Sequence, residues 1–296
     1  MNSKIKKISI GTAQFGLNYG SLRKRKKITN FDFKKIISYC KKKRISKLDT
    51  AINYGDSQKK IGKILKRSKN KFTITSKIPT LKNVKIKNIN KIILNFIKSS
   101  RKDLQNEIDT ILIHDENDLL LKKGKVIFET LSKLKKRKIV KNIGFSIYSF
   151  ENILKIIKKY QFDTIQVPFN LFDQRILNPK ILKTLKRKRI KIQIRSIFLQ
   201  GLLVEYNKKN LIKKSFRLKF KNLDEFLSKN KINALEACIM FVKNYNFYSN
   251  IIIGVDNFDQ LKEILMYFNK NKNCNINFNN LKSNDLQLIN PLYWKK

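Results

Sequence analysis

The chain has 296 residues, of which 67 are Lys or Arg and 21 are Asp or Glu, so its formal net charge is +46. A chain of this length buries enough apolar surface to fold without a disulfide or a metal. The three cysteines, Cys40, Cys238 and Cys274, lie far apart and form no metal-binding spacing with the single His114. The composition therefore excludes a zinc module or a disulfide scaffold and favours a reducing compartment.

The ends and the hydropathy of the chain indicate its location. The N-terminal residues are basic but run directly into an apolar strand pattern, with no signal-peptide core. No apolar run approaches the length of a membrane span. We therefore expect a cytoplasmic chain with no membrane partner and no metal.

The basic charge raises the possibility of binding to nucleic acid, since cationic surfaces attract phosphate backbones. The Lys and Arg residues are spread over nearly every expected helix, and no nucleic-acid-binding motif accompanies them. Abundant Lys, Ile, Asn and Phe with scarce Gly and Pro are typical of an AT-rich genome. We expect no specific nucleic-acid partner, and keep a basic barrel that binds acidic surfaces as an alternative.

Short β-branched runs alternate with amphipathic segments along almost the whole chain. The runs are continuous rather than alternating, as expected for parallel strands covered on both faces. The expected strands are Ile8–Gly11, Lys47–Thr50, Thr73–Lys77, Thr110–His114, Asn142–Ser146, Thr164–Pro168, Lys191–Ser196 and Ile251–Val255. The clearest helices are Asp32–Lys43, Ser57–Arg67, Val126–Arg137, Ser149–Tyr160 and Phe258–Phe268.

Eight strand–helix units in succession predict an α/β fold, a single (β/α)8 TIM barrel with a C-terminal tail. We assign residues 1–296 to one domain, with the barrel at about 7–270 and the tail at 271–296. Residues 199–231 are long enough for a lid or substrate loop. The apolar cluster Pro291–Trp294 is expected to dock on the body.

The chemistry of such a barrel lies at the carboxyl ends of its strands. Asp49 ends the second expected strand, Tyr54 follows in its loop, Lys77 ends the third and His114 ends the fourth. Hydride reduction of a carbonyl leaves charge on oxygen, so a proton donor is needed. Tyr54 could donate if Lys77 lowered its pKa and Asp49 held Lys77 in place, while His114 oriented the oxygen.

Each of these side chains alone has a structural explanation as a loop cap or a packing residue. Their occurrence together at one rim favours a catalytic group. The acidic residues that follow His114, which are Asp115, Glu116 and Asp118, are expected to be solvated or to cap a helix.

These residues resemble the aldo-keto reductase signature. The segment Lys47–Gly55, the pair Ser76 and Lys77, and the strand ending in His114 match it in order, and the resemblance extends from Ile8 to about Phe268. It implies an NAD(P)H-dependent reductase in which Tyr54 is the general acid, Lys77 and Asp49 tune it, and His114 orients the carbonyl. The first-strand segment, residues 195–203 and Pro291–Trp294 are similar to a bacterial branch of this family.

The same resemblance implies contacts to a nicotinamide cofactor. Arg195 stands where many members stack a Tyr under the nicotinamide, and Ile147 stands where an Asn is usual. The expected cofactor-binding residues are Gly11, Thr12, Ser146, Gln166, Arg195, Ser196, Gly254, Gln260 and Glu263. NADP(H) is favoured by the family, while Asp256 and the lack of a basic phosphate clamp keep NAD(H) open.

The substrate implied is a small carbonyl compound, an aldehyde or ketone that is sugar-linked or otherwise small. The residues expected near its pocket are Phe15, Asn18, Tyr19, Phe169 and Phe198. An alternative is a barrel that binds cofactor but is catalytically silent and acts as a regulatory or interaction subunit.

Overall fold

The computed structural model describes residues 4–20, 27–66, 71–207, 214–270 and 276–294. Eight parallel strands close into a barrel in which each strand pairs with the next along the chain and the last pairs with the first. The strands are β1 Ile8–Gly11, β2 Lys47–Asp49, β3 Thr73–Ile78, β4 Thr110–Ile113, β5 Asn142–Ser146, β6 Thr164–Pro168, β7 Lys191–Arg195 and β8 Asn250–Gly254. The predicted (β/α)8 fold is confirmed.

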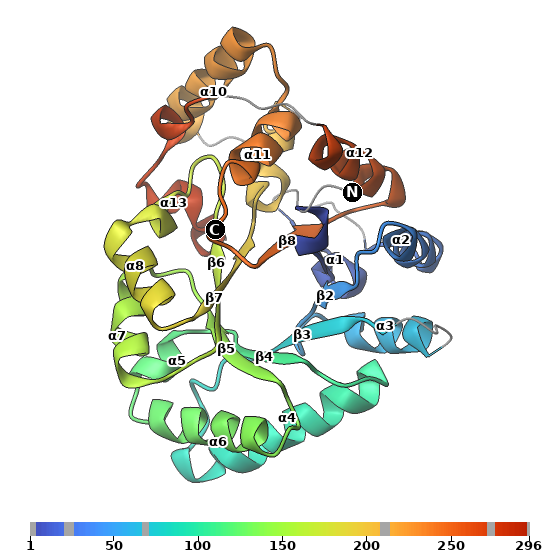
Figure 1. Ribbon diagram of the computed structural model, residues 1–296, viewed down its shortest axis with the longest axis vertical. Coiled ribbons are helices and arrows are strands. Elements are labelled where there is room, and N and C mark those ends of the chain that lie inside the picture. The colour runs from blue at the N-terminus through green and yellow to red at the C-terminus, as the bar shows by residue number, and fades with distance from the viewer. Residues whose placement is uncertain (1–3, 21–26, 67–70, 208–213, 271–275, 295–296) are drawn as a thin grey trace.

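Helices surround the strands on the outside (Figure 1). They are α1 Ala13–Gly16, α2 Asn30–Lys42, α3 Ser57–Leu65, α4 Ile89–Leu104, α5 Asn117–Leu120, α6 Gly124–Lys136, α7 Glu151–Lys159, α8 Pro179–Arg187, α9 Leu202–Glu205, α10 Arg217–Asn230, α11 Ala234–Lys243, α12 Phe258–Asn269 and α13 Leu286–Ile289. The five predicted helices correspond to α2, α3, α6, α7 and α12; the predicted end of α3 at Arg67 lies outside the described residues.

Closure of the barrel explains why the strands are largely buried. β1 lies between β2 and β8, with Gly11 opposite both Asp49 and Gly254. Every residue of β1, β4 and β6 is buried, because the barrel interior takes one face and the helices cover the other. The strand ends that sequence predicted are within a residue of those observed, so the side chains at the carboxyl rim could be predicted closely.

The segment after β7 differs from its prediction as one long loop. It contains the short helix α9, and then α10, a helix of 14 residues whose apolar side Phe220, Leu223 and Leu227 is buried. Phe220 stacks edge-on against Phe172 of the loop after β6. Of the described residues of this segment, those around Gln200 and α9 line the cavity described below.

The C-terminal tail lies against the barrel, as expected. The Phe278 carbonyl accepts a hydrogen bond from the Gln174 amide, and the Ser283 backbone N–H donates to the Phe172 carbonyl. The Trp294 indole N–H donates to the carbonyls of Gln287 and Leu288 at 3.0 and 3.2 Å. The first two bonds hold the tail to the loop after β6, while the indole bonds lie within the tail. Of the cluster that was expected to dock, Pro291 is buried, but Leu292 and Tyr293 are 57% and 47% exposed.

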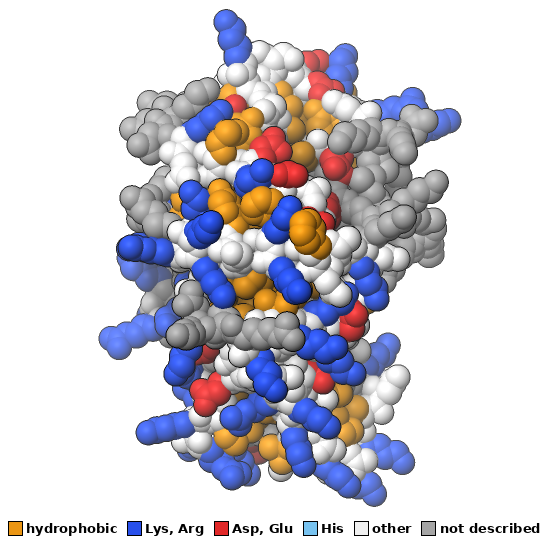
Figure 2. Space-filling view, turned by 90° about the vertical axis from the view of Figure 1, so that its right-hand side faces the viewer, with side chains coloured by type: hydrophobic (Ala, Val, Ile, Leu, Met, Phe, Trp, Pro, Cys, Tyr) orange, Lys and Arg blue, Asp and Glu red, His pale blue; other side chains and the backbone are white. Residues whose placement is uncertain are grey.

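The basic side chains are dispersed. On the face seen in Figure 2, Lys and Arg cover the surface from end to end, with acidic and apolar side chains between them. None of the helices in the described part of the chain is long and apolar enough to cross a membrane.

Candidate active site

The predicted catalytic residues meet at the carboxyl ends of β2, β3 and β4. The Lys77 ammonium contacts Asp49 Oδ1 at 2.5 Å and donates to the Thr50 carbonyl at 2.9 Å. The two side chains are 1% and 5% exposed. Because a buried charge is costly unless it is paired, this arrangement keeps Lys77 in one position below the rim.

Tyr54 and His114 lie above this ion pair. The Lys77 Nζ is 5.3 Å from the centroid of the Tyr54 ring, and the His114 ring meets that ring edge-on at 5.9 Å between centroids. Among the described residues, no hydrogen bond is made by the Tyr54 hydroxyl or the His114 ring, and both side chains face one cavity. Both are therefore available to a substrate oxygen.

The acidity of Tyr54 differs from its prediction. Burial, followed by the negative charge of Asp49, raises the pKa of the Tyr54 phenol above its ordinary value, and the charge of Arg195 opposes this only in part. The expectation that Lys77 holds this pKa below its ordinary value is wrong, because burial and the charge of Asp49 together raise it. Tyr54 therefore carries its proton throughout the physiological range.

His114 is neutral in this site. Burial, together with the charges of Lys77 and Arg195, lowers the pKa of the imidazole to about 3. A neutral imidazole has one N–H donor and one acceptor, so it can donate to a carbonyl oxygen without a full positive charge.

The neutral His114 predicts the pH dependence of catalysis. Since its pKa is lowered from 6.5 to about 3, the ring stays deprotonated above that value and binds no proton between pH 5 and 8. We expect kcat/KM to show no limb near pH 6.5 in this range. Stopped-flow measurement of carbonyl reduction from pH 5 to 8 checks this. A limb near 6.5 that disappears in His114→Gln would contradict it.

The predicted cofactor residues border a second, elongated cavity, here called the cofactor cleft. It runs from Asp49 and Tyr54 at the barrel mouth to α12. Of the nine residues predicted to bind cofactor, eight line it: Gly11, Thr12, Gln166, Arg195, Ser196, Gly254, Gln260 and Glu263. Ser146 is 2% exposed and lies beside Gln166 in the strand register, but is absent from the described lining.

Gln166 shows that the cleft fits a nicotinamide. Its amide nitrogen donates to Asp49 Oδ2 at 2.7 Å and to Gln193 Oε1 at 3.1 Å, which fixes the orientation of the amide group. Its own carbonyl oxygen is buried and has no hydrogen-bond partner among the described residues. A buried acceptor without a partner is costly. The amide N–H of a nicotinamide carboxamide is a donor that fits this position.

The far end of the cleft is acidic. Gln260 and Glu263 are on the first turns of α12, where Gln260 Oε1 accepts from the Asp256 backbone N–H at 2.7 Å. Glu205 of α9 lines the same cleft. Arg195 is the one Lys or Arg among the described residues that border it, and it lies toward the barrel mouth with Tyr54 and Gln166.

Arg195 contacts a residue that the sequence did not single out. Its guanidinium lies over the Tyr148 ring, 4.1 Å from the centroid. Tyr148 follows the end of β5 by two residues, so a search extended just past each strand end would have found it. A lone Tyr in a loop belongs to no motif, and its position over Arg195 requires the tertiary structure.

Tyr54, His114 and Tyr148 border the first of the two cavities, the one that Tyr54 and His114 face, here called the substrate cavity. Its described lining is Leu17, Asn18, Tyr19, Gly20, Asn53, Tyr54, His114, Tyr148, Gln166, Arg195, Gln200, Pro291, Leu292 and Trp294. Of the residues predicted near the substrate, Asn18 and Tyr19 border this cavity and Phe198 borders the cofactor cleft. Phe15 and Phe169 do not: each is fully buried and packs on other aromatic rings.

Two of the three acidic residues after His114 differ from their prediction, whereas Asp115 is partly exposed and accepts from the Asn117 backbone N–H. Glu116 is 3% exposed and accepts from the backbone N–H groups of Tyr148 and Ser149. Asp118 is 1% exposed and accepts from the Leu81 backbone N–H at 2.6 Å. Both are buried carboxylates that hold neighbouring loops, rather than solvated residues.

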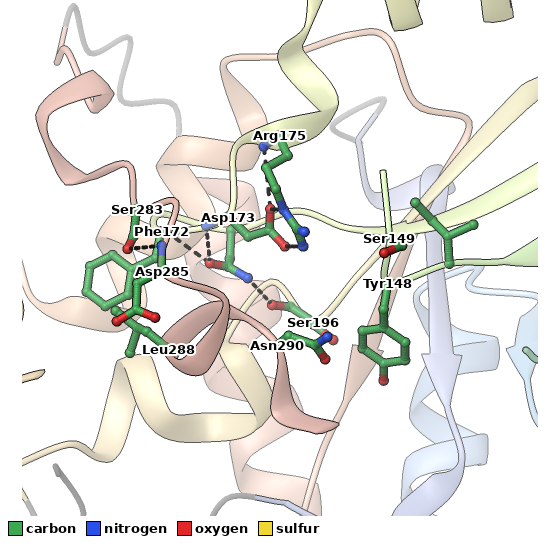
Figure 3. A network of polar contacts seen from close by, with 12 residues as sticks. Tyr148, Ser149, Phe172, Asp173, Arg175, Ser196, Ser283, Asp285, Leu288 and Asn290 are labelled. Atoms are coloured by element: carbon green, nitrogen blue, oxygen red, sulfur yellow. Dashed lines mark hydrogen bonds and ion pairs between the residues drawn. The ribbon is translucent and has the colours of Figure 1, made fainter. Parts of the chain in front are cut away.

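A polar network at the start of the loop after β6 holds that loop in place (Figure 3). The Asn170 side chain accepts from the backbone N–H groups of Phe172 and Asp173 and donates to the Ser196 carbonyl at 3.1 Å. Ser196 has a φ of +56°, which is unusual for a residue other than Gly. The network therefore stabilises the turn that directly follows Arg195.

Comparison with known proteins agrees with this site. The family model for the aldo/keto reductase family matches residues 7–276, so the chain belongs to this family. It is an oxidoreductase of a family that uses nicotinamide cofactors and acts on small carbonyl compounds. A comparison with curated protein sequences gives no match.

Solved structures share the fold at low identity. The holo form of aldo-keto reductase AKR11C1 from Bacillus halodurans has a TM-score of 0.72 and 16% identity, over 90% of this chain and 88% of that one. The glycerol dehydrogenase AKR11B4 from Gluconobacter oxydans has a TM-score of 0.68 and 17% identity, over 96% of this chain and 92% of that one.

Proposed function

We propose that this chain reduces an aldehyde or ketone, small or sugar-linked, to the alcohol in the cytoplasm, with residues 1–296 acting as one domain. The observation that carries the proposal is the position of Tyr54. Its ring lies 5.3 Å from the Lys77 ammonium and 5.9 Å from the His114 ring, where the cofactor cleft and the substrate cavity meet.

The reduction adds a hydride to the carbonyl carbon and a proton to its oxygen. The reduced nicotinamide supplies the hydride when it is bound. The Tyr54 hydroxyl donates the proton, and the neutral His114 donates a hydrogen bond that orients the oxygen. As the proton leaves Tyr54, the nearby Lys77 stabilises the negative charge of the phenolate, while Asp49 keeps that ammonium in place.

The cofactor would be held along the cleft. Gln166 offers its unpaired carbonyl oxygen to the carboxamide, and Ser146 lies beside it in the strand register. Gly11, Thr12, Gly254 and the other lining residues named above border the rest of the cofactor. NADP(H) is favoured by family membership, and NAD(H) is the second possibility.

Cofactor preference is expected to be modest. Glu263 lies where the resemblance places the adenosine end, Glu205 borders the same cleft, and carboxylates repel a 2′-phosphate. We expect NADPH to be preferred over NADH by less than about 10³-fold, roughly 4 kcal/mol. Titration of both cofactors measures the ratio. Glu263→Lys should raise this NADPH-to-NADH ratio about tenfold, near 1.4 kcal/mol. The distant Glu129→Lys on α6 should leave it unchanged. A wild-type ratio above about 10³ would contradict the inference that the acidic end of the cleft disfavours a 2′-phosphate.

The proposal is tested by a turnover screen. Oxidation of NADH and of NADPH is followed by absorbance against aldehydes, ketones and keto-sugars, with Tyr54→Phe as the matched inactive protein. Turnover that depends on Tyr54 supports the proposal. Cofactor binding without turnover of any carbonyl would instead support a catalytically silent barrel.

A further inference from the structure

Arg195 is the single charged side chain on the described wall of the substrate cavity, since His114 on the same wall is neutral. Its guanidinium is fixed in three ways. It lies over the Tyr148 ring, Nη2 donates to the Ile147 carbonyl at 2.8 Å, and Nη1 contacts Ser196 Oγ at 3.2 Å. The Asn170 network holds the following turn, so the cation is positioned before any ligand arrives.

Most of the hydrogen-bonding capacity of Arg195 is unused. A guanidinium has five N–H donors, and two of them have partners among the described residues. No described carboxylate forms an ion pair with Arg195; that of Glu116 accepts instead from the backbone N–H groups of Tyr148 and Ser149. The remaining donors are available at the junction of the two cavities.

Arg175 shows what a structural arginine looks like in this fold. Its guanidinium lies 4.5 Å from the centroid of the Phe150 ring, as that of Arg195 lies over Tyr148. In addition it forms a two-point ion pair with the buried Asp173, at 2.8 and 2.7 Å (Figure 3). Arg195 likewise lies over an aromatic ring, but no described carboxylate forms an ion pair with it. A partly buried cation without a paired anion is costly, which indicates that a ligand supplies the anion.

We propose that Arg195 binds an anionic group of the substrate, a carboxylate or a phosphate, while Tyr54 and His114 bind its carbonyl oxygen. This inference rests on the proposed carbonyl reduction. The substrates are then oxo acids or phosphorylated hydroxyaldehydes rather than neutral carbonyls. Guanidinium geometry suits both oxyanions, because two parallel N–H groups can reach two oxygens. The amides of Asn18, Asn53 and Gln200 suit hydroxyl groups between the two ends.

The net charge of +46 attracts every anion, so the test must separate Arg195 from the general field. Two matched pairs of substrates do so: 4-oxobutanoate with butanal, and glyceraldehyde 3-phosphate with glyceraldehyde. The measured quantity is the ratio of kcat/KM for the anionic to the neutral member. Arg195 also borders the cofactor cleft, and any effect on the cofactor cancels in this ratio because both members use it.

We expect Arg195→Gln to lower this ratio about 10–100-fold for at least one pair, as for loss of hydrogen bonds to a charged group. A response of the 4-oxobutanoate pair indicates that Arg195 binds a carboxylate, and a response of the glyceraldehyde 3-phosphate pair indicates a phosphate. Arg195→Lys should retain part of the ratio. The control Lys125→Gln removes one charge from a side chain on α6 that is 78% exposed and should leave the ratio unchanged. The inference would be overturned if Arg195→Gln left the anionic-to-neutral ratio unchanged for both pairs. It would also be overturned if Lys125→Gln lowered the ratio as much as Arg195→Gln does.

A binding measurement separates failure of this inference from failure of the proposed function. Trp294 is the one Trp of the sequence and borders the substrate cavity, so its fluorescence reports ligands there. With oxidised nicotinamide bound, 4-hydroxybutanoate and glycerol 3-phosphate are titrated beside 1-butanol and glycerol. Tighter binding of an anion that Arg195→Gln abolishes supports the inference even without turnover. Equal binding of anions and alcohols overturns it, whether or not carbonyls are reduced.

Discussion

Tyr54→Phe is expected to lower kcat/KM for carbonyl reduction by about 10²–10⁴-fold, the range for loss of a general acid. The proton is needed only as charge develops on the carbonyl oxygen, so the loss falls on the chemical step. The phenyl ring keeps the edge-on contact with His114 and the position near Lys77. Cofactor dissociation constants should therefore remain within about twofold of wild type, near 0.4 kcal/mol.

Single-turnover kinetics and cofactor titration measure the two effects separately. Tyr160→Phe is the matched control, because Tyr160 lies at the end of α7 and packs on Phe128 and Phe162 away from the cavities. It should reduce carbonyls at the wild-type rate. Near wild-type turnover in Tyr54→Phe would remove Tyr54 from the role of proton donor.

The fold could be predicted because its signals are local and repeated. Each strand is a short apolar run that closure of the barrel buries on both faces, and the helices between them have one apolar side. The segment after β7 could not be predicted in this way. The apolar residues of α10 that contact the body are interspersed with Lys and Asn, so the segment looked like a polar loop.

The site could be predicted where the chemistry follows the strand ends. Asp49, Lys77 and His114 are at or next to the ends of β2, β3 and β4, and barrel geometry alone brings them together. The buried roles of Glu116 and Asp118 could not be predicted, since their partners lie 32 to 37 residues away in other loops. Phe15 and Phe169 lie near the rim in sequence, yet their rings turn into the core.

The acidity of Tyr54 also required the structure. From the sequence, a nearby ammonium suggested a lowered pKa. In the structure, burial of the phenol raises its pKa most, and the charge of the nearby Asp49 raises it further. The balance between these effects depends on distances that no sequence pattern contains.

Lys77→Met is expected to be more damaging than any other single loss of positive charge on this basic chain. Exposed lysines contribute about 0–1 kcal/mol each through their ion pairs. Removing Lys77 leaves the buried Asp49 carboxylate without a cation, which typically costs about 3–5 kcal/mol of unfolding free energy. Chemical denaturation measures this. Lys82→Met, at an exposed position of the loop after β3, should change stability by less than about 0.5 kcal/mol.

The rate effect of Lys77→Met is separable from its effect on stability. Asp49 already raises the pKa of Tyr54, and without Lys77 its charge is no longer offset. The phenolate left by proton transfer then forms near an unpaired carboxylate and without the ammonium that lies 5.3 Å from the ring, so the rate falls. The double variant Lys77→Met with Asp49→Asn removes the unpaired charge, so it should recover most of the stability but not the rate. If the double variant recovered both, Lys77 would have a structural role alone, and stabilisation of the Tyr54 phenolate by Lys77 would be wrong.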